Sequence, residues 1–215
     1  MGLAEFPGFD DVMRLRLNAA VDRLCNEFEG VHDRPVISRV VEESAQRLST
    51  RGVTPFVHIL AERFARERLQ AQGQSEGRIA KEQPAVVFVS LTGGGRAQIG
   101  AALLARKAGD AVTIHSAGSD AGPEIDDNVR VAMEEIDVDL GEAFTKPLTL
   151  EVLASADVIV TMGRSVGAFE IPATVRHVDW RVGDPAGADL DEVRRVREDI
   201  ERRVDALVGE LLSAV

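Results

Sequence analysis

Residues 84–97 read PAVVFVSLTGGGRA, and this stretch decides the fold. Its first part, Ala85–Ser90, is a continuous apolar run of the kind found in parallel strands that are buried on both faces. A glycine-rich turn follows, and Ala97–Lys107 then has the apolar spacing of a helix. A strand, a glycine loop and a helix in this order present the N-terminus of the helix to a ligand.

Outward from this stretch, strand and helix patterns alternate. Further strands are expected at 112–117, 157–162 and 175–180, and further helices at 124–136, at 150–156 and from Leu190 onward. Such alternation predicts an α/β fold, a parallel sheet with helices on both faces.

The residues before Pro84 have a different pattern. Apolar residues recur there at helical spacing in three short segments, the third beginning at Thr54–Pro55, which predicts a small three-helix bundle. The polar, glycine-punctuated stretch that follows resembles a linker. We therefore expect a bundle at 1–72, a linker at 73–83 and an α/β domain at 84–215.

Composition and charge exclude several classes of function. The 215 residues carry a net charge of −11, of which about −10 falls after residue 80, so an acidic surface argues against a nucleic-acid partner. The apolar runs are too short to span a membrane, and the first residues lack the basic stretch of a secretory signal, so we expect a cytoplasmic protein. Cys25 is the only cysteine, and the four histidines lack ligand spacing, so no disulfide, metal or cofactor is predicted.

The glycine loop has the composition of an oxyanion site. Three glycines allow backbone N–H groups to turn inward, the following helix adds partial positive charge, and Arg96 offers a planar fork to a tetrahedral anion. The expected oxyanion-binding residues are Leu91, Thr92, Gly93, Gly94, Gly95, Arg96 and Ala97. A nucleotide-binding loop would need Gly-Lys-Ser/Thr after the glycines, and a dinucleotide fingerprint would need a sixth-position glycine where Gln98 stands, so both alternatives fail.

Ser90 to Arg96 has the spacing of the C-x5-R loop of low-molecular-weight protein tyrosine phosphatases and of the arsenate reductases built on the same fold, and the chain resembles this family. Further similar segments follow in the same order, namely 116–119 (SAGS), 146–149 (KPLT), 160–163 (VTMG), 179–180 (DW) and 184–187 (DPAG). The resemblance implies a four-stranded parallel sheet with the oxyanion loop after the first strand. It also implies catalytic positions at Ser90, Arg96 and Asp184, with Asp184 as the general acid that protonates the leaving oxygen.

This chain departs from the family where the nucleophile should stand. The family has a cysteine thiolate at the position of Ser90 and a hydroxyl residue at the position of Ala97, and the segment after Met162 holds no cysteine. We therefore predict a protein that binds a phosphate- or arsenate-like oxyanion with impaired catalysis. A deliberate Cys→Ser replacement would explain Ser90 but not Ala97.

Three alternatives remain open at this stage. The chain could be an active arsenate reductase or phosphatase, or a non-catalytic interaction protein with a vestigial pocket. Gly163–Gly167 (GRSVG) also matches a hydrolase nucleophile elbow, with His177 as the only downstream histidine, but Pro172 falls where the helix of the elbow should continue.

The first 72 residues are expected to form a homodimer. A bundle of this size buries little apolar surface, and pairing of two copies is a common solution. The segment 60–69 (LAERFARERL) also resembles the end of the three-helix dimerisation domain that precedes some actinobacterial arsenate reductases.

Overall fold

The computed structural model describes residues 6–50, 56–122, 124–163 and 169–213. The chain forms two compact units, Met1–Ala80 and Lys81–Val215. The division falls within the segment expected as a linker.

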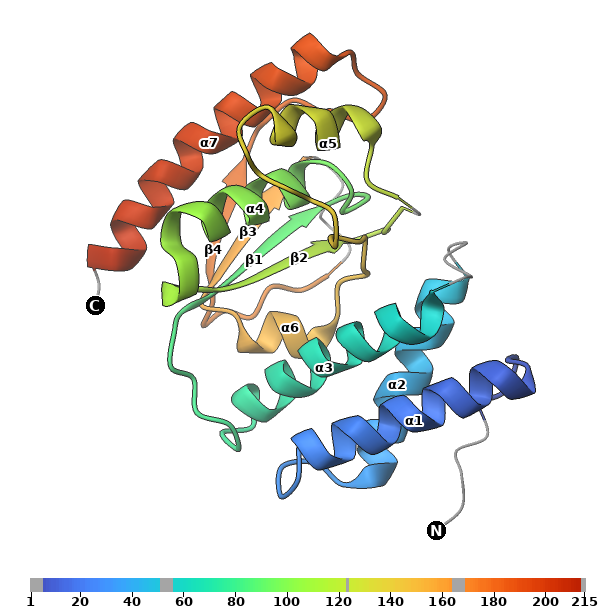
Figure 1. Cartoon of the computed structure of the whole chain (residues 1–215). Coiled ribbons are helices and arrows are strands. Elements are labelled where there is room, and N and C mark those ends of the chain that lie inside the picture. The colour runs from blue at the N-terminus through green and yellow to red at the C-terminus, as the bar shows by residue number, and fades with distance from the viewer. Residues whose placement is uncertain (1–5, 51–55, 123, 164–168, 214–215) are drawn as a thin grey trace. The chain divides into compact units, whose positions relative to one another are not determined.

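The first unit is a three-helix bundle (Figure 1). Its helices are α1 (Asp11–Glu27), α2 (Arg34–Ser49) and α3 (Val57–Ser75). Asp10 caps α1 by accepting a hydrogen bond from the N–H of Met13 at 2.8 Å, and Pro35 stands in the first turn of α2. The expected start of the third helix, Thr54–Pro55, lies outside the described residues.

The third helix is longer than the sequence predicted: α3 extends three residues into the expected linker, as far as Ser75. The N–H groups of Arg78 and Ile79 both donate to the carbonyl of Gly73, at 2.8 and 3.0 Å. A Cβ at Gly73 would lie 2.5 Å from the side chain of Ile79. The residues after Ser75 therefore fold back onto the end of α3, and the glycine permits this close approach rather than marking a flexible segment.

The second unit is built on a four-stranded parallel sheet. Its strands are β1 (Ala85–Ser90), β2 (Thr113–Gly118), β3 (Val158–Met162) and β4 (Arg176–Trp180), in the order β2-β1-β3-β4. Ser90 is paired with Gly118 on one side and with Met162 on the other, so the end of β1 lies between the ends of β2 and β3. The predicted α/β fold is confirmed.

Helices cover both faces of this sheet (Figure 1). The helices α4 (Arg96–Ala108), α5 (Asp127–Glu134) and α7 (Leu190–Ser213) lie on one face, and the short α6 (Leu150–Ser155) lies on the other. The fifth helix is shorter than the expected 124–136, because the carboxylate of Asp126 caps it by accepting from the N–H of Asn128 at 2.9 Å. Gly122 and residues 124–126 therefore lie outside the helix, where they line the site described below.

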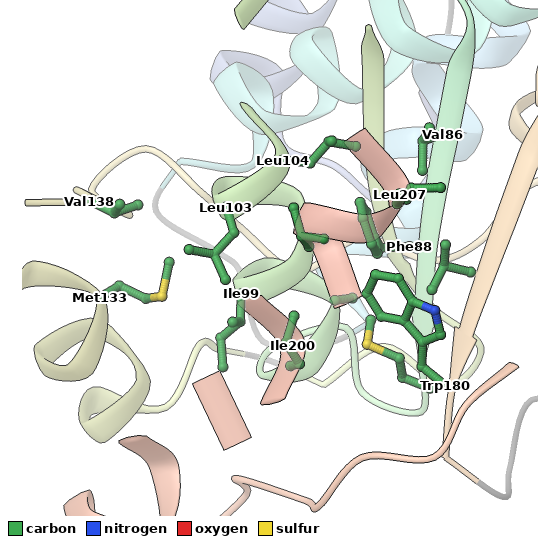
Figure 2. Close-up of a cluster of buried hydrophobic side chains, with 14 of the residues drawn as sticks. Val86, Phe88, Ile99, Leu103, Leu104, Met133, Val138, Trp180, Ile200 and Leu207 are labelled. Carbon is green, nitrogen blue, oxygen red and sulfur yellow. The ribbon is translucent and has the colours of Figure 1, made fainter. Parts of the chain in front are cut away.

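The core on the three-helix side fixes α4 against β1. Figure 2 shows Ile99, Leu103 and Leu104 of α4 in one buried cluster with Phe88 of β1 and with the α7 residues Ile200 and Leu207. The rings of Phe88 and Trp180 meet with centroids 5.8 Å apart. All seven of these side chains are at most 5% exposed, so the start of α4 is held rigidly at the end of β1.

Candidate functional site: an anion-binding cleft

The glycine loop lies where the chain reverses its direction across the sheet. From β1 the chain passes to β2 on one side and then to β3 on the other, and ligands of open parallel sheets bind at such a switch point, beyond the carboxyl ends of the strands. A cleft of about 360 Å³ opens there. Its lining residues are Ser90, Thr92, Gly94, Gly95, Arg96, Gly122, Glu124, Ile125, Asp126, Asp127, Asp184 and Ala186.

The three glycines of the loop each lie against a different segment of the chain. A Cβ at Gly93, where φ is +71°, would lie 2.7 Å from the backbone nitrogen of Gly118, and one at Gly94 would lie 2.5 Å from the carbonyl oxygen of Glu124. A Cβ at Gly95 would lie 2.8 Å from the ring of Pro185. Only Gly93 needs a left-handed backbone, so the other two glycines are required by close packing.

The loop is also held in place by Gln98, a residue that no sequence pattern had singled out. Its buried amide nitrogen donates to the carbonyl of Gly93 at 3.0 Å and to that of Phe144 at 3.2 Å. The side-chain amide of Gln98 therefore connects the loop at Gly93 to the backbone at Phe144. Such support keeps the backbone of the loop in one conformation before any ligand arrives.

Ser90 ends β1 at the base of the cleft and is 2% exposed. Its hydroxyl oxygen accepts a hydrogen bond from the N–H of Gly93 at 3.2 Å. Within the described parts of the chain, no histidine, lysine or carboxylate bonds to this hydroxyl. The serine therefore lacks the adjacent base that would make a hydroxyl a nucleophile.

Arg96 is the one basic side chain among the residues that line the cleft. Its Nη2 donates to Oδ2 of Asp184 at 3.0 Å, and the arginine side chain is only 9% exposed while the aspartate is 57% exposed. No other acceptor for the guanidinium is found among the described residues, which leaves its remaining N–H groups available to a ligand.

The N-terminus of α4 adds backbone donors to the same place. Gly95 caps this helix, and the N–H groups of Gly95, Arg96 and Ala97 find no acceptor in the described portion of the chain. Such first-turn N–H groups, together with the helix dipole, favour an anion at this position.

Part of the wall of the cleft is acidic, which no sequence pattern predicted. Glu124, Asp126 and Asp127 line it along with Asp184. Asp126 is occupied as the cap of α5, and its Oδ2 accepts from the N–H of Gly187 at 3.3 Å. The pairing of β2 with β1 brings Gly122 and residues 124–127 to the loop, and this proximity depends on tertiary pairing rather than on a local sequence pattern.

The structure brings together most, but not all, of the residues expected at the site. Ser90, Thr92, Gly94, Gly95, Arg96 and Asp184 line the cleft, whereas Leu91, Gly93 and Ala97 are not among the lining residues. The side chain of Ala97 is fully buried in the core beneath the loop. Ala97 can therefore contribute only through its backbone.

The described residues hold no candidate for a metal site, because no three His, Cys, Asp or Glu side chains are grouped there as metal ligands, and no helix among them is long and apolar enough to cross a membrane. His177, required by the hydrolase alternative, has its Nε2 2.9 Å from the hydroxyl oxygen of Thr161. The residues Arg164–Gly167 of the candidate elbow lie outside the described residues.

The fold and the cleft define an α/β protein with a candidate anion site. That site consists of a glycine loop after a buried strand, an arginine at the end of the loop and an aspartate bonded to the arginine. The sequence model of the low molecular weight phosphotyrosine protein phosphatases matches residues 85–214, more than half of the chain, and the chain belongs to this family. Residues 17–73 match the model of the protein-tyrosine-phosphatase-like N-terminal domain.

Arsenate reductases are among the relatives of this chain. A thioredoxin-dependent arsenate reductase of Corynebacterium glutamicum is 32% identical and superposes with a TM-score of 0.83, over 93% of this chain and 98% of that one. An arsenate reductase of Bacillus cereus is 29% identical over 126 residues, which are 57% of this chain and 93% of the relative. A structure of an arsenate reductase in the phosphate binding state shares the fold, with 21% identity and a TM-score of 0.52 over 60% of this chain and 99% of that one.

Proposed function

We propose that this protein binds a phosphate- or arsenate-like oxyanion in the loop Ser90–Ala97 and does not turn it over by the thiolate chemistry of its family. The convergence of Arg96 and the N-terminus of α4 on one cleft is the observation that supports binding. The phosphate binding state of a structural relative supports the same ligand class.

The impairment of catalysis rests on Ser90. A serine hydroxyl ionises far less readily than a thiol, and no base bonds to Ser90 in the described structure. Ala97, whose methyl group points into the core, offers no hydroxyl to stabilise an anion at Ser90. The reaction of a phosphatase therefore lacks its first step.

Arsenate reduction meets a further obstacle. The reaction requires two electrons, which relatives draw from thiols, and residues 81–215 contain no cysteine. Cys25 is the only thiol of the chain, so no disulfide can form within one molecule. Asp184 lines the cleft at the position of the proton donor in the family reaction. Without a nucleophile at position 90, no covalent intermediate forms, so there is no leaving group for Asp184 to protonate.

The binding of the anion is tested by calorimetry with inorganic phosphate, sulfate and arsenate. We expect the wild-type protein to bind and Arg96→Ala to lose at least about tenfold in affinity, since charge-assisted hydrogen bonds contribute roughly 1.5–3 kcal/mol. Equal binding by both proteins would contradict the site. Absence of binding in both would favour an interaction protein with a vestigial pocket.

The impairment of catalysis is tested by restoring the nucleophile. We expect negligible hydrolysis of an aryl phosphate by the wild-type protein and slow hydrolysis by Ser90→Cys, because only the thiolate is restored while Ala97 still cannot stabilise it. The matched control is Ser90→Ala, which should stay inactive. Robust arsenate reduction or hydrolysis by the wild-type protein would contradict the proposal and support an active enzyme.

A further inference from the structure

Gly163 follows β3 and lies directly against the guanidinium group of Arg96. A Cβ built on this glycine would lie 2.7 Å from Nη1, 3.0 Å from Cζ and 3.0 Å from Nη2 of Arg96. These three atoms span the plane of the guanidinium, so its flat face rests on the bare Cα of the glycine. Heavy atoms do not approach a real Cβ at the shortest of these distances.

The guanidinium has little freedom to move away from such a collision. The arginine residue is only 8% exposed, and its Nη2 is held by Asp184 at 3.0 Å. Arg96 also begins α4, whose following residues are packed into the core. A side chain at position 163 would therefore force the guanidinium to rotate out of the place where it faces the cleft.

The backbone at Gly163 makes a second, independent demand for glycine. Its φ is +100°, in a region that residues with a Cβ rarely adopt. The position is thus restricted both by its own conformation and by the space that Arg96 occupies.

We propose that Gly163 is a positioning residue for the oxyanion site: its missing side chain forms the surface on which the guanidinium of Arg96 is laid flat, with its free N–H groups directed to the ligand. This inference rests on the proposed function, because Arg96 is taken as the ligand-binding cation. A planar donor recognises a tetrahedral oxyanion only when its plane is fixed, since the two parallel hydrogen bonds depend on orientation.

The test compares two alanine substitutions at glycines with a positive φ. Gly163→Ala introduces backbone strain and a collision with Arg96, whereas Gly109→Ala, at φ +52° with no atom within 4 Å of its Cβ, introduces the strain alone. With inorganic phosphate in calorimetry, we expect Gly163→Ala to weaken binding by about tenfold or more, approaching the loss in Arg96→Ala. Gly109→Ala should bind within about twofold of wild type.

A stability measurement covers the case in which Gly163→Ala folds poorly. Thermal unfolding, followed by the fluorescence of Trp180, is compared in the wild-type and Arg96→Ala backgrounds. Because removal of the arginine side chain removes the collision, Gly163→Ala should lower the melting temperature clearly less in the Arg96→Ala background than in the wild-type background. Equal losses in the two backgrounds would overturn the contact.

The outcomes separate the two proposals. If wild-type protein does not bind phosphate, the proposed function fails, whatever Gly163→Ala does. If wild-type protein binds and Gly163→Ala binds equally well, the positioning role of Gly163 is overturned while the oxyanion site stands.

Discussion

At the scale of single residues, the ion pair between Arg96 and Asp184 has two opposing effects on the binding of an anion. The carboxylate fixes one N–H group of the guanidinium, at 3.0 Å, and at the same time brings a negative charge to the place where an oxyanion must bind. Two like charges a few ångströms apart at a protein surface repel by roughly 1–4 kcal/mol, depending on the effective dielectric constant. An arriving anion therefore competes with Asp184 for Arg96.

This competition predicts that Asp184→Asn tightens the binding of phosphate. We expect the affinity to rise by about three- to tenfold, since the amide keeps the size of the side chain but removes its charge. Glu124→Gln is the matched control, because Glu124 lines the same cleft but is not hydrogen-bonded to Arg96, and its effect should be smaller. Calorimetry with phosphate measures both.

The opposite result would also be informative about Asp184. Weaker phosphate binding by Asp184→Asn would show that the carboxylate mainly orients Arg96, and the competition would be excluded. In the Ser90→Cys background, the same Asp184→Asn change should abolish the gained hydrolysis without weakening phosphate binding, because the amide cannot donate a proton to the leaving oxygen.

At the scale of secondary-structure elements, α4 contains a glycine in its interior, which lowers the intrinsic stability of the helix. Gly100 lies in the interior of α4, where a glycine costs about 1 kcal/mol relative to alanine. A Cβ at this position would lie 2.8 and 2.9 Å from Cδ1 and Cε1 of Phe88, a fully buried ring that also contacts Trp180. The glycine therefore allows α4 to approach β1 and to place its N-terminus at the cleft.

The substitution Gly100→Ala raises the helix propensity of α4 but introduces a clash with Phe88, so its effect on stability shows which of the two is larger. Overpacking a core costs about 1–3 kcal/mol, and most of this range exceeds the gain of about 1 kcal/mol in helix propensity, so we expect a net loss of stability of up to about 2 kcal/mol. Urea unfolding followed by the fluorescence of Trp180 measures it. Ala105→Gly, at an exposed position of the same helix, isolates the propensity effect, and a stabilised Gly100→Ala would show that Phe88 moves aside without cost.

The sequence predicted the elements better than it predicted the site. The apolar run Ala85–Ser90 and the alternation after it were sufficient for the sheet, because a strand buried on both faces has a local signature. The loop and Arg96 were also visible, since glycines and a charged residue stand together in the chain.

Residues brought to the site by tertiary packing could not be predicted. Gly163 approaches Arg96 only because β3 pairs with β1, and the acidic wall around Glu124 approaches only because β2 pairs on the other side. The predicted end of the third helix was wrong for a related reason. Gly73 resembles the start of a linker in the sequence, but in the structure it lies within α3 and permits a close contact with Ile79.

At the scale of the whole molecule, the helical bundle carries apolar residues that its own fold does not cover. Ion pairs join Arg23 to Glu62 and Glu27 to Arg66. Both pairs link a residue of α1 to the residue of α3 that follows it by 39 positions, so the two helices run parallel. Four large apolar residues at or near the N-termini of these two helices are exposed, namely Val12, Leu15, Phe56 and Ile59. We refer to these four exposed residues together as the apolar patch of the bundle.

We predict that two copies of the chain pair through this apolar patch. Each of the four side chains is 48–68% exposed, and burial of apolar area contributes about 25 cal/mol per Å². The bundle has a net charge of only about −1, so two copies repel each other weakly, whereas the residues after 80 carry about −10. The expected state of the full chain in light scattering is a dimer.

Two variants distinguish pairing through the patch from pairing elsewhere. A chain that begins at Glu82 should be a monomer, since it lacks the bundle but keeps the second compact unit. The double substitution Leu15→Glu and Phe56→Glu should make the full chain a monomer with an unchanged melting temperature, because both side chains are more than 60% exposed and do not support the core. Leu17→Glu, at a fully buried position of α1, is the contrasting control and should unfold the bundle instead. A dimer of the chain from Glu82 would place the interface on the α/β unit, and a full-length monomer would show that each bundle is stable without a partner.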